Sequence, residues 1–115
     1  MNTKLSSSQR LKSSKKIEQL FASGKSAKAF PLLMRYSESD IKQHKAAFAV
    51  SKRNFKRAVD RNRVKRLLRE AYRLERDENL QSSARYLMLF IYTGKNLPTL
   101  NELRLQMVKL LKQLE

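Results

Sequence analysis

Basic side chains that could contact phosphate are concentrated in one stretch of this chain, from Ser51 to Arg73. The stretch reads SKRNFKRAVDRNRVKRLLREAYR and carries ten basic residues against two acids, so its net charge of +8 is half of the formal +16 of the whole 115-residue chain. Seven of the ten are arginines, whose planar guanidinium groups suit bidentate contact with phosphate and stacking on bases. Because such a charge density destabilises a folded domain unless a polyanion neutralises it, the stretch indicates a nucleic-acid-binding surface. A solvated charged face without a ligand is the alternative.

The residues that catalysis by the chain itself would need are missing. The sequence has no cysteine, no glycine-rich phosphate loop and only one histidine, His44, and its ten acids are scattered. His44 stands in a polar segment, residues 37–45, where we expect it to be exposed to solvent rather than to bind a metal. The sequence therefore predicts no catalytic residue and no metal site, so any phosphodiester cleavage would need an active site on another molecule.

Composition and length indicate one small soluble domain. Hydrophobic residues make up 41% of the 13.5 kDa chain, too many for a disordered polybasic tail. The longest apolar run, Tyr86–Tyr92, is much shorter than the roughly 20 residues needed to cross a bilayer, and the N-terminal residues lack the apolar segment of a signal peptide. We expect a cytoplasmic protein that does not bind membranes, with a mobile basic arm at residues 1–13 and a single domain at residues 14–115.

Periodicity and capping signals predict three helices and three strands. A cap at Ser13 or Ser14 begins a first helix that ends at Gly24, and Thr99 with Glu102 forms a capping box for the last helix. Strands are expected at Phe30–Tyr36, Ala46–Ser51 and Arg85–Thr93, and a long basic helix at about Lys56 to Arg76. This helix-strands-helix-strand-helix order indicates an α+β fold, a small sheet packed with three helices in a two-layer sandwich. The pairing of the strands stays open.

The basic helix presents cationic flanks beside one apolar face. At 100° per residue, Arg61, Lys65 and Arg69 form a row along one flank, and Arg63 projects on the other. Asn62, Arg66 and Arg73 lie toward the back. The helix can therefore contact two nucleic-acid surfaces at once. Its apolar face is expected to consist of Val64, Leu67, Leu68, Ala71 and Leu74.

The run AFAVSKRNFKRAVDRNRVKRLLREAYR resembles the signature of the bacterial ribonuclease P protein subunit. The matching parts are a strand that ends in Ser51-Lys52-Arg53, the pair Ala58-Val59, and the motif from Arg61 to Arg69. Arg10-Leu11 and Phe21-x-x-Gly24 also match, and the likeness covers residues 9 to 114. The resemblance implies an RNA-binding α+β domain with a left-handed crossover through the basic helix, against the usual right-handed preference.

The resemblance also implies a function and partners. It implies a subunit of the endoribonuclease ribonuclease P, which binds the catalytic RNA and the 5′ leader of precursor tRNA and assists removal of the leader to give the mature 5′ end. Catalysis and magnesium binding are expected of the RNA subunit, with no metal bound tightly by the protein and no protein partner required. The alternatives are a stand-alone RNA-binding protein, such as a ribosomal protein, and a protein-only nuclease. A ribosomal protein would not be expected to carry the Arg61–Arg69 run, and the nuclease would need acids and histidines that are missing.

Carried over position by position, the resemblance implies two sets of RNA-binding residues. Contact with the catalytic RNA is expected from Arg53, Arg61, Asn62, Arg63 and Arg66. The groove for the 5′ leader is expected to include Ile17, Phe21, Arg35, Ala49, Ser51, Lys65 and Arg69. Ile17 and Arg35 stand where aromatic residues are common in the family, and Ala47 replaces a frequent glycine, so we expect a groove that depends more on charge and less on stacking. For Phe21, a place in the core is the alternative.

Overall fold

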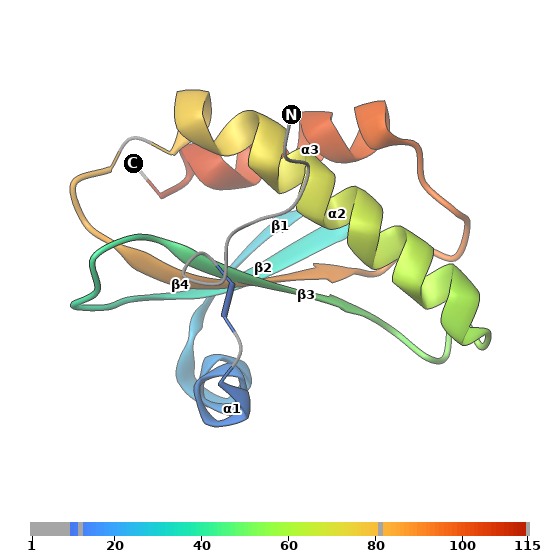
Figure 1. Ribbon diagram of the computed structural model, residues 1–115, viewed down its shortest axis with the longest axis horizontal. Coiled ribbons are helices and arrows are strands. Elements are labelled where there is room, and N and C mark those ends of the chain that lie inside the picture. Colours follow the sequence, from blue (N-terminus) through green and yellow to red (C-terminus); the bar gives the residue numbers. More distant parts are fainter. Residues whose placement is uncertain (1–9, 12, 81, 115) are drawn as a thin grey trace.

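The computed structural model describes residues 10, 11, 13–80 and 82–114. In this part of the chain, helices α2 and α3 cover one face of a four-stranded sheet, and helix α1 lies against the other face (Figure 1). The α+β class and the order of elements are confirmed. The sheet forms two layers with α2 and α3, as expected, but α1 lies on the other face of the sheet and not in the same helical layer. The elements are α1 (Ser14–Ser23), β1 (Lys25–Ala29), β2 (Leu32–Glu38), β3 (Lys45–Val50), α2 (Ala58–Asn79), β4 (Tyr86–Tyr92) and α3 (Leu100–Lys112).

The strands are arranged in the order β1-β2-β4-β3, with antiparallel β1–β2 and β2–β4 pairs and a parallel β3–β4 pair. The expected strand at Phe30–Tyr36 is the second arm of a hairpin, in which Phe30 and Pro31 form the turn and β2 begins at Leu32. Pro31 therefore marks a turn before an interior strand and not an edge strand. Strand β1 was missed because its sequence, KSAKA, buries only Ala27 and so has no clear apolar alternation.

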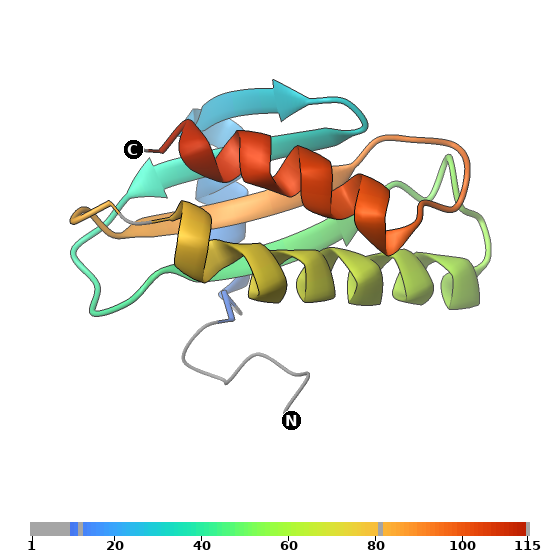
Figure 2. The same cartoon turned by 90° about the horizontal axis from the view of Figure 1, so that it is seen from above.

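The parallel pair requires a crossover connection, which α2 provides. Figure 2 views the sheet from the side of α2 and α3, with β3 and β4 both pointing to the right. The chain leaves β3, passes in front of the sheet through α2, and enters β4 on the upper side of β3. This sense of rotation is left-handed, the hand that the resemblance implies and the rarer one in proteins.

The central strand β4 is buried on both faces, as its nearly continuous apolar sequence predicts. Met88 and Phe90 are fully buried toward α2 and α3, in the larger apolar cluster of the domain. Leu87 and Leu89 point to the other face, where they pack with Leu20 of α1. The side chains of β4 thus hold helices on both sides of the sheet.

The folded domain begins before residue 14. Leu11 is buried in the α1-side cluster, and its backbone N–H donates a hydrogen bond of 2.9 Å to the carbonyl of Ala46 on β3. Arg10 forms a parallel bridge with the same residue. These two residues therefore belong to the domain and not to the expected mobile arm, whose residues 1–9 and 12 lie outside the described residues.

Helix α2 begins at Ala58 and ends at Asn79, so it starts two residues later and ends three residues later than expected. Asn79 is buried and donates from Nδ2 to the carbonyl of Glu75, which holds the last turn in place. The expected apolar face is correct for Val64, Leu68 and Ala71, but Leu67 and Leu74 are only half-buried. The face also includes Tyr72 and Glu75, because the helix turns these residues toward β3 and α3.

The ends of the other two helices follow their capping signals. Ser13 Oγ accepts from the N–H of Lys16 at the start of α1. Thr99 and Glu102 form the reciprocal capping box of α3. Gly24 ends α1 with a negative φ, and a Cβ there would lie 2.7 Å from the carbonyl oxygen of Leu20. Glycine is needed at this position for the close approach of the chain to the last turn.

Candidate nucleic-acid interface

The sheet face next to α1 carries part of the expected leader groove. Ala49 of β3 and Ile91 of β4 are paired in register, and both are half-buried on this face. Ile17 packs against the same cluster from α1. The side chain of Phe21 is 54% exposed, which excludes the alternative of a core residue. This face therefore offers one exposed aromatic ring beside a shallow apolar floor.

Arg35 on β2 holds the end of α1 against the sheet. Its Nε donates to the carbonyl of Leu20 at 2.9 Å, its Nη2 donates to the carbonyl of Phe21 at 2.8 Å, and its Nη1 donates to Ser26 Oγ at 2.8 Å. Helix C-termini carry unpaired carbonyl groups and a partial negative charge, which a guanidinium satisfies. Arg35 therefore positions α1 and Phe21, and this role was not foreseen from the sequence.

The basic turn, which we define as residues 51–57, is ordered by its own hydrogen bonds. Ser51 Oγ accepts from the N–H of Arg53, and the Ser51 carbonyl accepts from the N–H of Phe55. Arg61 reaches back from α2, and its Nη1 donates to the carbonyls of Phe55 and Lys56 at 2.8 and 2.9 Å. The turn therefore presents Arg53 to solvent from a fixed backbone, while Arg61 uses part of its guanidinium internally.

The outer surface of α2 carries the rest of the set expected to contact the catalytic RNA. Asn62, Arg63 and Arg66 are exposed, and Arg63 lies on the other side of the helix from Arg61. Glu70, one of five acids on the helix, is engaged by Arg73 through two hydrogen bonds. The neighbouring arginines are therefore left without that carboxylate as a partner.

Arg69 lies over β3, the edge strand of the sheet. Its Cζ is 5.9 Å from the centroid of the Phe48 ring on β3, in cation–π geometry. Burial lowers the pKa of Arg69, and the positive charges of Arg10 and Arg66 lower it further. Within the described residues, none of these three arginines forms an ion pair. They form the edge cluster, a group of like charges that an anion would stabilise.

Arg10 belongs to this cluster because of how the chain enters the sheet. It pairs with Ala46, whose side chain faces α2, and so its own side chain points to the same face. Its Nε is buried without a hydrogen-bond partner. Arg10 matches the family in sequence, but the resemblance places it in neither of the two expected sets of RNA-binding residues. The only sequence signal was its place in the Arg10-Leu11 pair.

The expected leader residues are split between the two faces of the sheet. Ile17, Phe21 and Ala49 lie on the α1 face, whereas Arg69 lies over Phe48 on the α2 face, with Lys65 one turn earlier on the same flank. Strand β3 at the sheet edge separates the two groups (Figure 1). A strand of RNA that contacts both groups must therefore cross the edge at β3.

His44 is half-buried and not the solvent-exposed loop residue that was expected. Its Nδ1 accepts from the N–H of Tyr86 at 3.1 Å, and its ring stacks on that of Tyr86. Burial lowers the pKa of His44, and the nearby charge of Arg85 lowers it further. The expectation failed because the polar segment folds back onto the start of β4.

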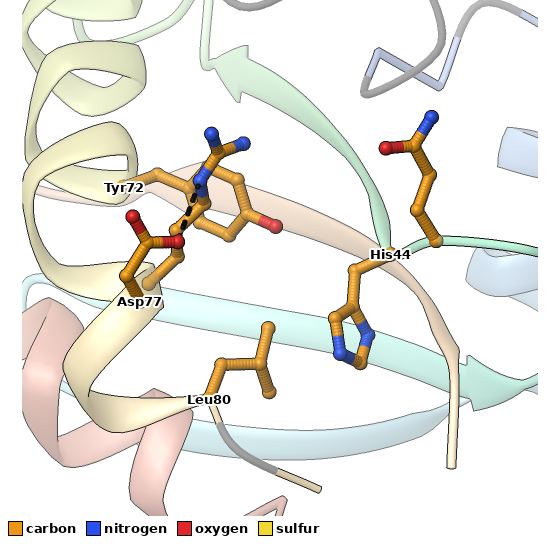
Figure 3. A pocket seen from close by; sticks show the side chains of 6 residues that line it. His44, Tyr72, Asp77 and Leu80 are labelled. Carbon is orange, nitrogen blue, oxygen red and sulfur yellow. Dashed lines mark ion pairs between the residues drawn. The ribbon is translucent and has the colours of Figure 1, made fainter. Parts of the chain in front are cut away.

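Figure 3 shows the pocket beside His44, with a volume of about 150 Å³, between the C-terminal part of α2 and the β2–β3 connection. An ion pair between Arg76 and Asp77 lies at its rim. No cluster of metal-ligating residues occurs in the part of the chain that the structure describes. The pocket is lined by Gln43, His44, Tyr72, Arg76, Asp77 and Leu80.

The fold and its surface together define a class of protein. It is a small basic α+β domain with an arginine-rich helix beside an edge strand, which is the arrangement of a nucleic-acid-binding module. In the described residues, no helix is long and apolar enough to cross a membrane. The family model of ribonuclease P matches residues 5–115, and the chain belongs to this family of ribonuclease P protein components.

Individual relatives agree with this assignment. The ribonuclease P protein component of Chlorobium phaeobacteroides is 50% identical over 68 residues, which are 54% of this chain and 47% of the relative. That of Chlorobaculum tepidum is 34% identical over 114 residues, 85% of this chain and 74% of the relative. The chain thus spans about half the length of the first relative and three quarters of the second. The fold matches a solved ribonuclease P protein from Thermotoga maritima with a TM-score of 0.76 at 21% identity, over 92% of this chain and 97% of that one.

Proposed function

We propose that this chain is the protein subunit of ribonuclease P and acts in the cytoplasm. It binds the catalytic RNA and the 5′ leader of precursor tRNA, and it assists the endonucleolytic removal of the leader. The observation that supports the proposal is that the expected RNA-binding residues lie on two separate surfaces of one basic domain. Arg53 on the basic turn and Asn62, Arg63 and Arg66 on the outer side of α2 form the first surface. Phe21 of α1 and Ala49 of β3 belong to the second, on the opposite face of the sheet.

The contribution of the protein in this proposal is binding and positioning. Each lysine or arginine that contacts a phosphate releases counterions, so affinity falls with salt by a log–log slope of about −0.7 to −0.9 per contact. The RNA subunit supplies the magnesium ions and the chemistry of cleavage. The side chains of this chain would neutralise phosphates and hold the leader in register with the cleavage site.

The test is cleavage of a precursor tRNA at low magnesium by the catalytic RNA of the same organism, with and without this protein. We expect cleavage at the mature 5′ end to be restored by the protein, which should be inactive alone. Activity of the protein without RNA would contradict the proposal. RNA binding with unchanged cleavage would instead favour a stand-alone RNA-binding protein, the alternative that shares the small size and high basicity.

A further inference from the structure

Three connections meet at one end of the domain and are joined through Thr93, the residue after β4. The N–H and Oγ1 of Thr93 both donate to the carbonyl of Pro31 in the β1–β2 turn, at 2.8 and 2.9 Å. The carbonyl of Thr93 accepts from Nδ2 of Asn54 in the basic turn at 3.1 Å. The β1–β2 turn is therefore fixed beside the basic turn, at the right-hand end of Figure 2.

Phe30 projects from this end. Its side chain is 78% exposed, more than any other large apolar residue described, and no described aromatic ring stacks on it. It stands next to Pro31, so the hydrogen bonds to Thr93 hold its backbone in place. Because the ring contributes almost nothing to the core, it is free to contact another molecule without loss of stability.

The surroundings of Phe30 are strongly basic. None of the three connections, residues 30–31, 51–57 and 93–99, contains an acid, and five basic residues lie within them. An exposed aromatic ring among phosphate-binding side chains is the arrangement with which proteins bind unpaired bases, since every base has a face that stacks on a ring. The basic residues are Lys52, Arg53, Lys56, Arg57 and Lys95.

We propose that Phe30 is a stacking platform for an unpaired base of the catalytic RNA. This inference rests on the proposed function, because it assumes that the catalytic RNA lies on the basic turn. The turn supplies contacts to phosphates, and Phe30 supplies the contact to a base next to them. The alternative is that Phe30 binds an apolar pocket of a protein partner, and the test must distinguish this from stacking on an RNA base.

The chain has no tryptophan, so a Phe30→Trp variant carries a single tryptophan, which can be excited selectively and reports on this site. We expect quenching of its emission by the catalytic RNA and no quenching by a fully paired RNA duplex. We expect Phe30→Ala to weaken binding of the catalytic RNA by about five-fold or more, and Phe30→Tyr to bind as the wild type does. Because the side chain is exposed, the melting temperature of Phe30→Ala should be unchanged. Leu105→Ala, at a 66% exposed site on α3, is the matched control and should bind normally.

Several results would overturn the inference. These are an unquenched Phe30→Trp variant, wild-type affinity of Phe30→Ala, and an equal loss in Leu105→Ala. A loss confined to a single-stranded leader oligonucleotide would also overturn it, because Phe30 would then serve the substrate and not the catalytic RNA. If the Phe30 variants give these results while the wild-type protein still restores cleavage, only this inference is wrong. If the wild-type protein itself does not bind the catalytic RNA, the proposed function fails.

Discussion

The guanidinium of Arg35 is bonded to the carbonyl of Leu20, with an Nε–O distance of 2.9 Å that ties the last turn of α1 to β2. A second bond, from Nη2 to the carbonyl of Phe21, lies beside it. The relationship connects stability with function, because Phe21 is the exposed aromatic residue of the α1 face. Arg35 thus acts through the residue that it holds in place.

We expect Arg35→Ala to lower the free energy of unfolding by about 2 kcal/mol, since hydrogen bonds that involve a charged donor contribute roughly 1.5–3 kcal/mol. Urea denaturation measures this effect. Arg35→Lys should recover only part of it, because an ammonium cannot reach both carbonyls in the fork geometry of a guanidinium. Leader affinity should fall along with stability in both variants. Normal leader binding by a destabilised Arg35→Ala protein would show that the leader groove does not depend on the docking of α1 by Arg35.

The roles of two pairs of basic residues on α2, Lys65 with Arg69 and Arg63 with Arg66, should be separable by mutation. We expect Lys65→Ala with Arg69→Ala to weaken binding of precursor tRNA relative to mature tRNA in the assembled complex. We expect Arg63→Ala with Arg66→Ala to weaken assembly with the catalytic RNA, whatever the substrate. Each pair removes two positive charges, so each variant is the charge-matched control of the other. Titrations at several salt concentrations should show the salt slope reduced by about 1.4–1.8 in the affected assay. Equal losses in both assays for both variants would show that the assignment is wrong.

Arg10 should show opposite effects on binding and on stability. Its charge repels those of Arg66 and Arg69, and its buried Nε has no partner. Arg10→Met keeps the apolar stem of the side chain and removes the charge. We therefore expect this variant to bind RNA more weakly and to be more stable at low salt by about 0.5 kcal/mol, a typical size for an interaction between exposed charges. The gain in stability should disappear at 1 M salt, where charges are screened. A loss of stability at low salt would mean that Arg10 serves the fold and not an anion.

Stability should fall on mild acidification because of His44. Burial, then Arg85, lowers the pKa of His44 in the folded protein, so the folded state favours the neutral ring. The stabilisation is complete above the unfolded pKa of about 6.5, and it is lost as the pH falls through the lower pKa of the folded state. Protonation would also remove the acceptor at Nδ1 that the N–H of Tyr86 uses.

The matched variant is His44→Asn, whose side-chain oxygen can replace Nδ1 as an acceptor but does not titrate. Denaturation curves between pH 7.5 and pH 5 should show a larger loss of unfolding free energy in the wild-type protein than in this variant. Parallel pH profiles for the two proteins would contradict the role of His44.

Much of the fold could be predicted because its signals are local. The apolar run of β4 predicted a strand covered on both faces, and the Thr99–Glu102 spacing predicted the capping box of α3. Strand β1 gave no such signal, because it is held by pairing with β2 along one side and buries only Ala27. His44 was misplaced for a related reason, since its partner Tyr86 lies 42 residues away in the sequence.

The sequence by itself determined the basic character of the domain, the order of its elements and the separation of Arg61 from Arg63 around α2. These properties depend on composition and on the angles within one helix. Only the tertiary structure decided that α1 and α2 lie on opposite faces of the sheet. The same structure placed Arg10 beside Arg69 and Phe30 beside the basic turn. Each of these relationships is set by strand pairing and packing between distant segments, which no local pattern of residues encodes.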